Sequence, residues 1–191
     1  MSSSAESRRL LVAGAADMLR RRGLNATSIR EVAKHSGAPL GSTYHYFPGG
    51  KQQLAAEAVR FAGESVARML REELQAGPVE GLRSFLGLWR EVITGTDYRA
   101  GCPVLAVSIE EGVGEESPDV LTAAGEVFAD WGSLLAESLR SSGVDAPRAE
   151  QLATLVVAAV EGAVVLCRAQ RSTRPLDHVA AQLEVLLQPG D

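Results

Sequence analysis

The sequence predicts an all-α protein of nine helices, and three observations support this fold class. Apolar residues recur at intervals of three and four residues through most of the 191-residue chain, which is the period of an amphipathic helix. No stretch shows the alternating apolar and polar order of a half-buried strand. Glycine or proline separates the periodic segments, for example at Gly23, Gly77-Pro78 and Ser142-Gly143, and such residues end helices.

The first three helices are expected at residues 7–22, 28–36 and 39–47. Ser28 and Glu31 have the spacing of a capping box, so Ser28 is expected to close the start of the second helix. Gly37 suits the left-handed position after that helix, and Pro39 suits the first position of the next one. Two short helices joined by such a turn form a helix-turn-helix, whose second helix enters the major groove of DNA.

The six remaining helices are expected at residues 51–75, 79–94, 102–112, 119–142, 147–170 and 175–187. The first of them is long and amphipathic. It starts directly after the helix-turn-helix and continues into the rest of the chain. We therefore expect it to link the two parts mechanically, with a domain boundary near residue 50 and no flexible linker.

The charge distribution agrees with a DNA-binding N-terminus, although the whole chain carries −5. Residues 1–51 hold eight Lys or Arg against three acids, a net charge of +5, so the remainder carries −10. A basic part on an acidic body is the electrostatic footprint of a local DNA contact; chance asymmetry is the other interpretation. Arg20, Arg21 and Arg22 either complement the dipole of the first helix or contact phosphates.

The sequence favours neither an enzyme nor a metal or cofactor protein. Cys102 and Cys167 are far apart and form no zinc-binding spacing or disulfide framework. The three histidines are scattered, and no P-loop or GxGxxG sequence is present. The start of the chain lacks the apolar core of a signal peptide, and the apolar stretch 152–167 is shorter than the ~20 residues of a membrane span. A soluble, cytoplasmic protein without membrane contact is expected.

The stretch from Ser28 to Leu54 resembles the TetR family of transcriptional repressors. The family pattern is matched by Val32-Ala33, by the run from Ser36 to Phe47, and by Lys51 followed by Leu54. Two departures are Pro39 in place of a capping serine, and a stretch before Lys51 that is one residue longer than usual. Gly101-Cys102-Pro103 is similar to the drug-responsive subgroup of the family.

The resemblance implies a helix-turn-helix DNA-binding domain at residues 1–50 and an effector-binding and dimerisation domain at residues 51–191. It implies a homodimer that a small apolar or aromatic effector releases from a near-palindromic DNA operator. An activator, or a small-molecule carrier or enzyme without a DNA role, are the alternatives.

The residues expected to contact DNA follow from this resemblance. They are Ser28, Arg30, Leu40, Gly41, Ser42, Tyr44, His45, Tyr46 and Lys51. Arg30 is expected to reach a base edge, since arginine is the commonest partner of guanine. The start of the third helix is expected to face bases, and its aromatic end to face phosphates.

Two further sites are expected in the C-terminal part. A cavity for the effector is expected to be lined by Phe61, Met69, Phe85, Trp89, Cys102, Leu105, Phe128, Trp131 and Val165. The alternative is that these side chains only fill the core. A dimer interface is expected from Leu152, Leu155, Val156, Ala159, Val160, Ala163, Leu183 and Leu187, because residues 147–170 are apolar almost all round and so need burial on several sides. An intramolecular core is the alternative there.

Overall fold

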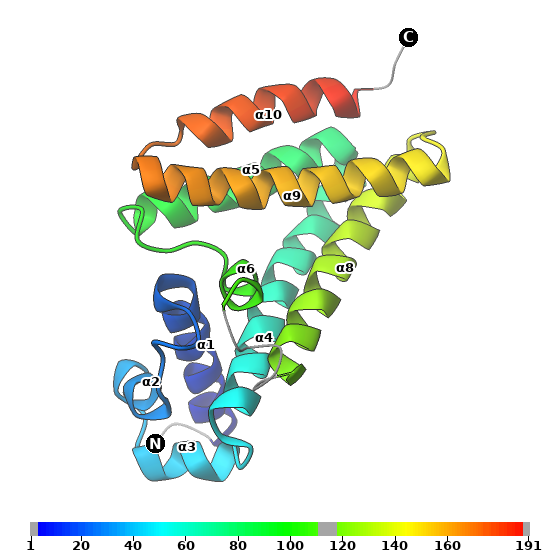
Figure 1. The fold of residues 1–191 in the computed structure, drawn as a ribbon. Helices are drawn as coiled ribbons and strands as arrows, with labels where there is room; N and C mark the ends of the chain where they lie inside the picture. Colours follow the sequence, from blue (N-terminus) through cyan, green and yellow to red (C-terminus); the bar gives the residue numbers. More distant parts are fainter. Residues whose placement is uncertain (1–3, 111–117, 189–191) are drawn as a thin grey trace. The chain divides into compact units, whose positions relative to one another are not determined.

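The computed structural model describes residues 4–110 and 118–188, and over these residues it contains nine α-helices, one short 3₁₀ segment and no strand (Figure 1). The predicted fold class is confirmed. The helices are α1 (Ser4–Arg22), α2 (Ile29–His35), α3 (Leu40–Tyr46), α4 (Gly50–Glu73), α5 (Pro78–Gly95), α6 (Pro103–Ser108), α8 (Pro118–Ser141), α9 (Ala146–Gln170) and α10 (Arg174–Leu187). The 3₁₀ segment (Leu74–Ala76) extends α4.

The helix ends agree with the sequence-based expectations to within three residues, with one exception. Helix α6 was expected to reach residue 112 and ends at Ser108; residues 111 and 112 lie outside the described part of the chain. Pro39 is the N-cap of α3 and not its first helical residue, because its backbone is extended with ψ 133°.

Contacts divide the chain into two compact units. The N-terminal unit comprises Met1–Glu64 and Cys102–Val127, and the C-terminal unit comprises Ser65–Gly101 and Phe128–Asp191. Helices α4 and α8 each contribute to both units. The packing thus groups α6 and the first part of α4 with the N-terminal helices, while the functional division near residue 50 stays a prediction.

In the N-terminal unit, α1, α2 and α3 enclose a small core in which Leu11, Val32 and Phe47 are buried. Helix α6 packs on α1. Helices α4 and α8 approach closely where α4 carries Gly63: a Cβ there would lie 2.4 Å from a methyl carbon of Val127. The missing side chain of Gly63 therefore sets how close these two helices come.

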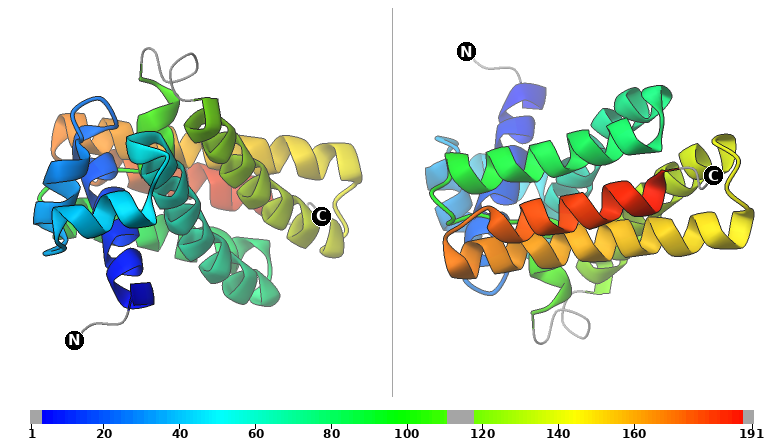
Figure 2. Two further views of the ribbon diagram at one scale, coloured as in Figure 1. Left: turned by 90° about the horizontal axis from the view of Figure 1, so that it is seen from below. Right: turned by 90° about the horizontal axis from the view of Figure 1, so that it is seen from above.

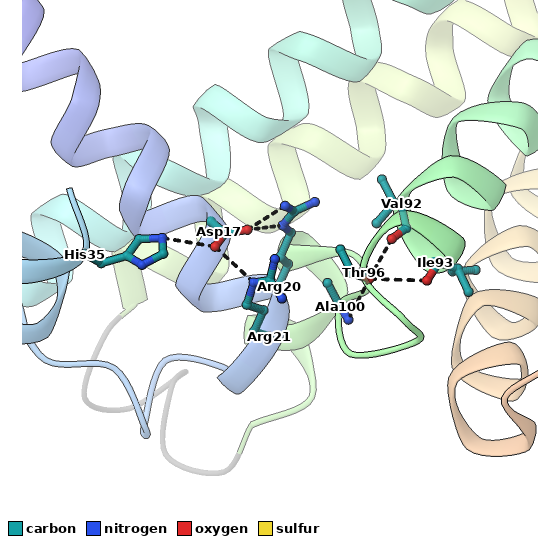
Figure 3. Close-up of polar contacts among 8 residues, drawn as sticks. All are labelled: Asp17, Arg20, Arg21, His35, Val92, Ile93, Thr96 and Ala100. Atoms are coloured by element: carbon teal, nitrogen blue, oxygen red, sulfur yellow. Dashed lines mark hydrogen bonds and ion pairs between the residues drawn. The ribbon is translucent and has the colours of Figure 1, made fainter.

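In the C-terminal unit, α9 and α10 run side by side, and α5 packs against both (Figure 2). Arg83 of α5 reaches Glu184 of α10 at 3.0 Å. The loop after α5 is held by Thr96, whose hydroxyl donates to the Val92 carbonyl at 2.6 Å and accepts from the Ala100 amide at 3.2 Å (Figure 3). These contacts fix the loop that precedes α6.

Candidate functional site

The start of α2 has the predicted capping box. The Ser28 hydroxyl accepts from the Glu31 amide at 3.2 Å, and the Ser28 amide donates to the Glu31 carboxylate at 3.2 Å. The same hydroxyl donates to Glu31 Oε2 at 2.8 Å. Both donors of Ser28 thus serve the cap in this structure, so a phosphate contact from Ser28 would require one of them to change partner.

The turn between α2 and α3 is set by glycine, as predicted. Gly37 has φ +65°, and the following Ala38 amide donates to the Ala33 carbonyl at 2.9 Å. A second glycine, which the sequence analysis did not consider, lets α1 approach this turn. A Cβ on Gly14 would lie 2.1 Å from the Ser36 hydroxyl oxygen. The turn is therefore positioned both by its own backbone and by its close contact with α1.

Helix α3 presents most of its predicted DNA-contacting residues to solvent. The exposed or partly exposed ones are Leu40, Gly41, Tyr44, His45 and Tyr46; the side chain of Ser42 lies outside the described part. Tyr44 is 58% exposed, so its ring and hydroxyl are accessible to another molecule. No heavy atom lies within 4 Å of a Cβ placed on Gly41, so another surface can approach the backbone there.

One cluster of charged side chains in the N-terminal unit centres on Asp17. Asp17 of α1 accepts from Arg20 and Arg21 of the same helix, and its carboxylate lies 3.1 Å from His35 Nε2 of α2 (Figure 3). Burial opposes the charge on Asp17, but the hydrogen bonds from Arg21 and Arg20 outweigh it and hold the pKa of this carboxyl below its usual value. These two arginines therefore pair with an acid of their own helix, and a phosphate contact from them stays a prediction.

Three other cations, close to the helix-turn-helix, are free to meet another molecule. Arg30 and Lys34 of α2 are exposed, Lys51 of α4 is partly exposed, and none of the three forms an ion pair within the described ranges. Two of them come from α2, which precedes the turn, and Lys51 comes from the start of α4. The N-terminal unit thus combines an exposed, aromatic α3 with unpaired positive charge, which is the composition of a nucleic-acid interface.

The predicted effector residues are divided between the two units. Phe61, Cys102 and Leu105 belong to the N-terminal unit; Met69, Phe85, Trp89, Phe128, Trp131 and Val165 belong to the C-terminal unit. The four aromatic side chains of the C-terminal unit are brought together, with ring centroids 5.6–6.4 Å apart in edge-to-face geometry. Among the described residues, the buried Trp89 Nε1 has no hydrogen-bond acceptor.

The predicted dimer-interface residues lie mainly inside the monomer. Six of the eight are buried in the chain itself, namely Leu152, Val156, Val160, Ala163, Leu183 and Leu187. Leu155 is 44% exposed and Ala159 is partly exposed. Other apolar side chains of these helices are exposed, namely Leu166 of α9, Val185 and Leu186 of α10, and Val165 of α9, which was expected to line the effector cavity. Hydrophobic spacing could not separate the two faces, because both are apolar.

Helix α9 is also the one helix among the described residues that is long and apolar enough to cross a membrane, with a mean hydropathy of 1.9. A single helix that meets this criterion of length and composition is weak evidence for a membrane span, and 44% of the segment is buried inside the protein. The described residues contain no group of three or more His, Cys, Asp or Glu side chains able to hold a metal ion.

Both parts of the chain match known families. Residues 11–58 match the family described as bacterial regulatory proteins, tetR family, and residues 78–182 match the LmrA/YxaF-like C-terminal domain of transcriptional regulators. An uncharacterized HTH-type transcriptional regulator of Mycobacterium tuberculosis (strain H37Rv) is 44% identical over 94% of this chain and 93% of its own length. The HTH-type transcriptional regulator LmrA of Bacillus subtilis (strain 168) is 32% identical over 97% and 98%.

Solved structures have the same fold. A TetR transcriptional regulator from Chloroflexus aurantiacus superposes with a TM-score of 0.77 at 26% identity, covering 98% of this chain and 96% of that one. A TetR-family regulator from Agrobacterium tumefaciens has a TM-score of 0.80 at 19% identity, covering 96% and 98%, and supports the fold alone. Together with the exposed α3 and the free cations beside it, these matches place the chain in the TetR family of DNA-binding transcriptional regulators, whose members are not enzymes.

Proposed function

We propose that this regulator is a homodimeric repressor that a small molecule releases from a near-palindromic operator. The observation that carries the DNA-binding role is the exposed surface of α3 beside the unpaired cations Arg30, Lys34 and Lys51. In this proposal the N-terminal half of α3, with Leu40 and Gly41, faces base edges. Tyr44 and its aromatic neighbours donate to phosphates and fix the register on the duplex.

The exposed apolar residues of α9 and α10 support dimerisation. Leu155, Val165 and Leu166 lie on α9, where the small exposed residues Ala158 and Gly162 separate them and allow a second helix to approach closely. Pairing this face with its copy gives a two-fold dimer, whose two α3 helices meet half-sites about one turn of DNA apart. Burial in such an interface also accounts for the apolar outer face of α9, and a cytoplasmic DNA-binding protein needs no membrane span.

The effector we expect is apolar or aromatic and carries a hydrogen-bond acceptor. The four-ring cluster supplies apolar surface, and the indole N–H of Trp89 is a buried donor without an acceptor among the described residues. A buried polar group without a partner is costly, so an acceptor on a ligand would be favoured there. Such a ligand releases DNA only if it binds the two conformations of the protein unequally. The assignment to the drug-responsive subgroup stays a prediction.

Selection of bound duplexes from a random DNA pool tests this function. We expect recovery of a sequence with two inverted half-sites about one helical turn apart, and an affinity that falls steeply as salt is raised. Recovery of no common sequence, together with binding that is insensitive to salt, would remove the DNA-binding role. Expression of the adjacent genes after deletion of the regulator then separates a repressor from an activator.

A further inference from the structure

The loop between α1 and α2 presents two backbone N–H groups to a carboxylate from a distant part of the chain. The amides of Leu24 and Asn25 both donate to Glu110 Oε2, each at 2.9 Å. Glu110 lies just after α6, 85 and 86 residues further along the chain. Consecutive amides that point the same way form a nest that binds anions, and here the occupant is a side chain of the same protein.

Gly23 makes this contact possible in two ways. Its φ of +76° turns the chain out of α1 so that the next two amides point outward together. A Cβ at this position would lie 1.6 Å from Glu110 Oε1, so any side chain would displace the carboxylate. The glycine is therefore required by both the turn and its occupant.

Helix α6 fixes the position of Glu110. The Cys102 sulfur caps the helix by accepting from the Leu105 amide at 3.5 Å, and Pro103, Val104 and Val107 are buried. The helix packs on α1 within the same unit. The carboxylate thus connects a short, well-anchored helix to the loop that leads directly into the capping box of α2.

We propose that Glu110 is a positioning residue for DNA binding: its carboxylate holds the α1–α2 loop, and through it α2 and α3, in the geometry that fits the major groove. Movement of α6 would withdraw the carboxylate and loosen this loop. The inference rests on the proposed function, because it assigns a residue that prepares α3 without touching DNA.

The sign of the effect on DNA affinity separates this role from simple electrostatics. DNA is a polyanion, so removal of a carboxylate by itself leaves binding unchanged or tightens it slightly. Loss of a residue that positions α3 weakens binding. The matched control is Glu137→Gln in α8, since Glu137 is an exposed glutamate of the C-terminal unit. Glu110→Gln keeps an oxygen acceptor but removes the charge, and Glu110→Ala removes both.

The test measures the full-length proteins in two ways. Amide hydrogen exchange of the free protein reports whether Leu24 and Asn25 remain bonded, and the duplex recovered by the wild-type chain from a random pool serves as the DNA probe. We expect both amides to exchange about 10-fold faster in Glu110→Ala. We expect operator affinity to fall about 10-fold in this variant and less in Glu110→Gln, while Glu137→Gln binds as the wild type or more tightly.

Two outcomes would overturn the inference. The first is unchanged or tighter binding by Glu110→Ala, which together with a lower melting temperature indicates a merely structural contact. The second is weaker binding while both amides stay protected. If the wild-type chain recovers no duplex, the proposed function fails and this inference fails with it. If the wild-type chain recovers a duplex and the Glu110 variants bind it as tightly as the wild type does, the proposed function stands and the role of Glu110 falls.

Discussion

A charged residue in the outer face of α9 should abolish the proposed dimer. Five large apolar side chains on α9 and α10 are 42–66% exposed in the monomer. Covering the exposed half of a leucine or valine contributes about 1 kcal/mol, so five residues from each of two subunits contribute about 10 kcal/mol. This is enough to offset much of the cost of association, and it makes the dimer depend on this face.

Leu166→Glu is the most informative single change. It removes about 1 kcal/mol of burial from each subunit and places a carboxylate in each copy of the interface. Because an uncompensated charge at a buried position costs several kcal/mol, we expect dimerisation to weaken by at least about 4 kcal/mol, or roughly 1,000-fold. Sedimentation equilibrium at micromolar concentration should then find a monomer, and operator binding should fall because only one α3 remains per molecule.

Leu121→Glu is the matched control. Leu121 lies on α8 in the N-terminal unit, is 41% exposed and receives the same charge, but it is not part of the α9 and α10 surface. We expect this variant to remain dimeric. If Leu166→Glu stays dimeric with the wild-type affinity, or if Leu121→Glu alone becomes monomeric, the interface has been assigned to the wrong face.

Three further predictions follow from the N-terminal unit. Arg30→Ala should relax base preference at one operator position, with a cost of about 1–3 kcal/mol, whereas Tyr44→Phe should weaken binding to all sequences similarly; a shift assay on operator variants checks both. The hydrogen bond from Ser28 holds the pKa of the Glu31 carboxyl below its usual 4.5. Glu31 therefore stabilises the fold above that pH and loses this effect as the pH falls through the lowered pKa. The difference in unfolding free energy between the wild type and Glu31→Gln should disappear in unfolding curves measured in acid. Gly63→Ala should destabilise the protein by about 1–2 kcal/mol in urea unfolding, because strain against Val127 exceeds the gain in helix propensity. Combined with Gly63→Ala, the change Val127→Ala should recover at least about 1 kcal/mol of the free energy of unfolding that the first change loses through strain. If the losses of the two single variants simply add in the double variant, the contact is refuted.

The sequence predicted the features that depend on local chemistry. The capping box at Ser28 and the left-handed Gly37 act within a few residues, so their spacing alone was informative. The pairing of Asp17 with Arg20 and Arg21 was also within reach, since these residues are three and four apart on one helix. The contact of Glu110 could not be predicted from the sequence. Its partners are backbone amides 85 and 86 residues away, and such amides leave no pattern in the side chains.

The choice between the two faces of α9 needed the fold for a different reason. Its buried face, with Val156 and Val160, and its exposed face, with Leu155 and Leu166, have similar composition, so the amphipathic period that usually identifies the inner side is weak. Only the packing of α5 and α10 decides which face is covered in the monomer. The face left open is the one available to a second subunit.

The ion pairs of the N-terminal unit make a quantitative prediction for the salt dependence of DNA binding. Of the eight cations in residues 1–51, half form ion pairs: Arg8, Arg20, Arg21 and Arg22. The other four, Arg9, Arg30, Lys34 and Lys51, form no ion pair within residues 4–110 and 118–188. If only these four contact phosphates, a dimer neutralises about eight, and the logarithm of the affinity should fall with the logarithm of salt with a slope of about −7. If all eight took part, the slope would approach about −14, which would mean that the acid partners release their arginines on binding.

A slope near −7 that becomes shallower by about 1 per subunit in Lys34→Gln, but stays the same in Arg21→Gln, would identify the unpaired cations as the ones that meet the DNA backbone. An equal change in both variants would contradict this division.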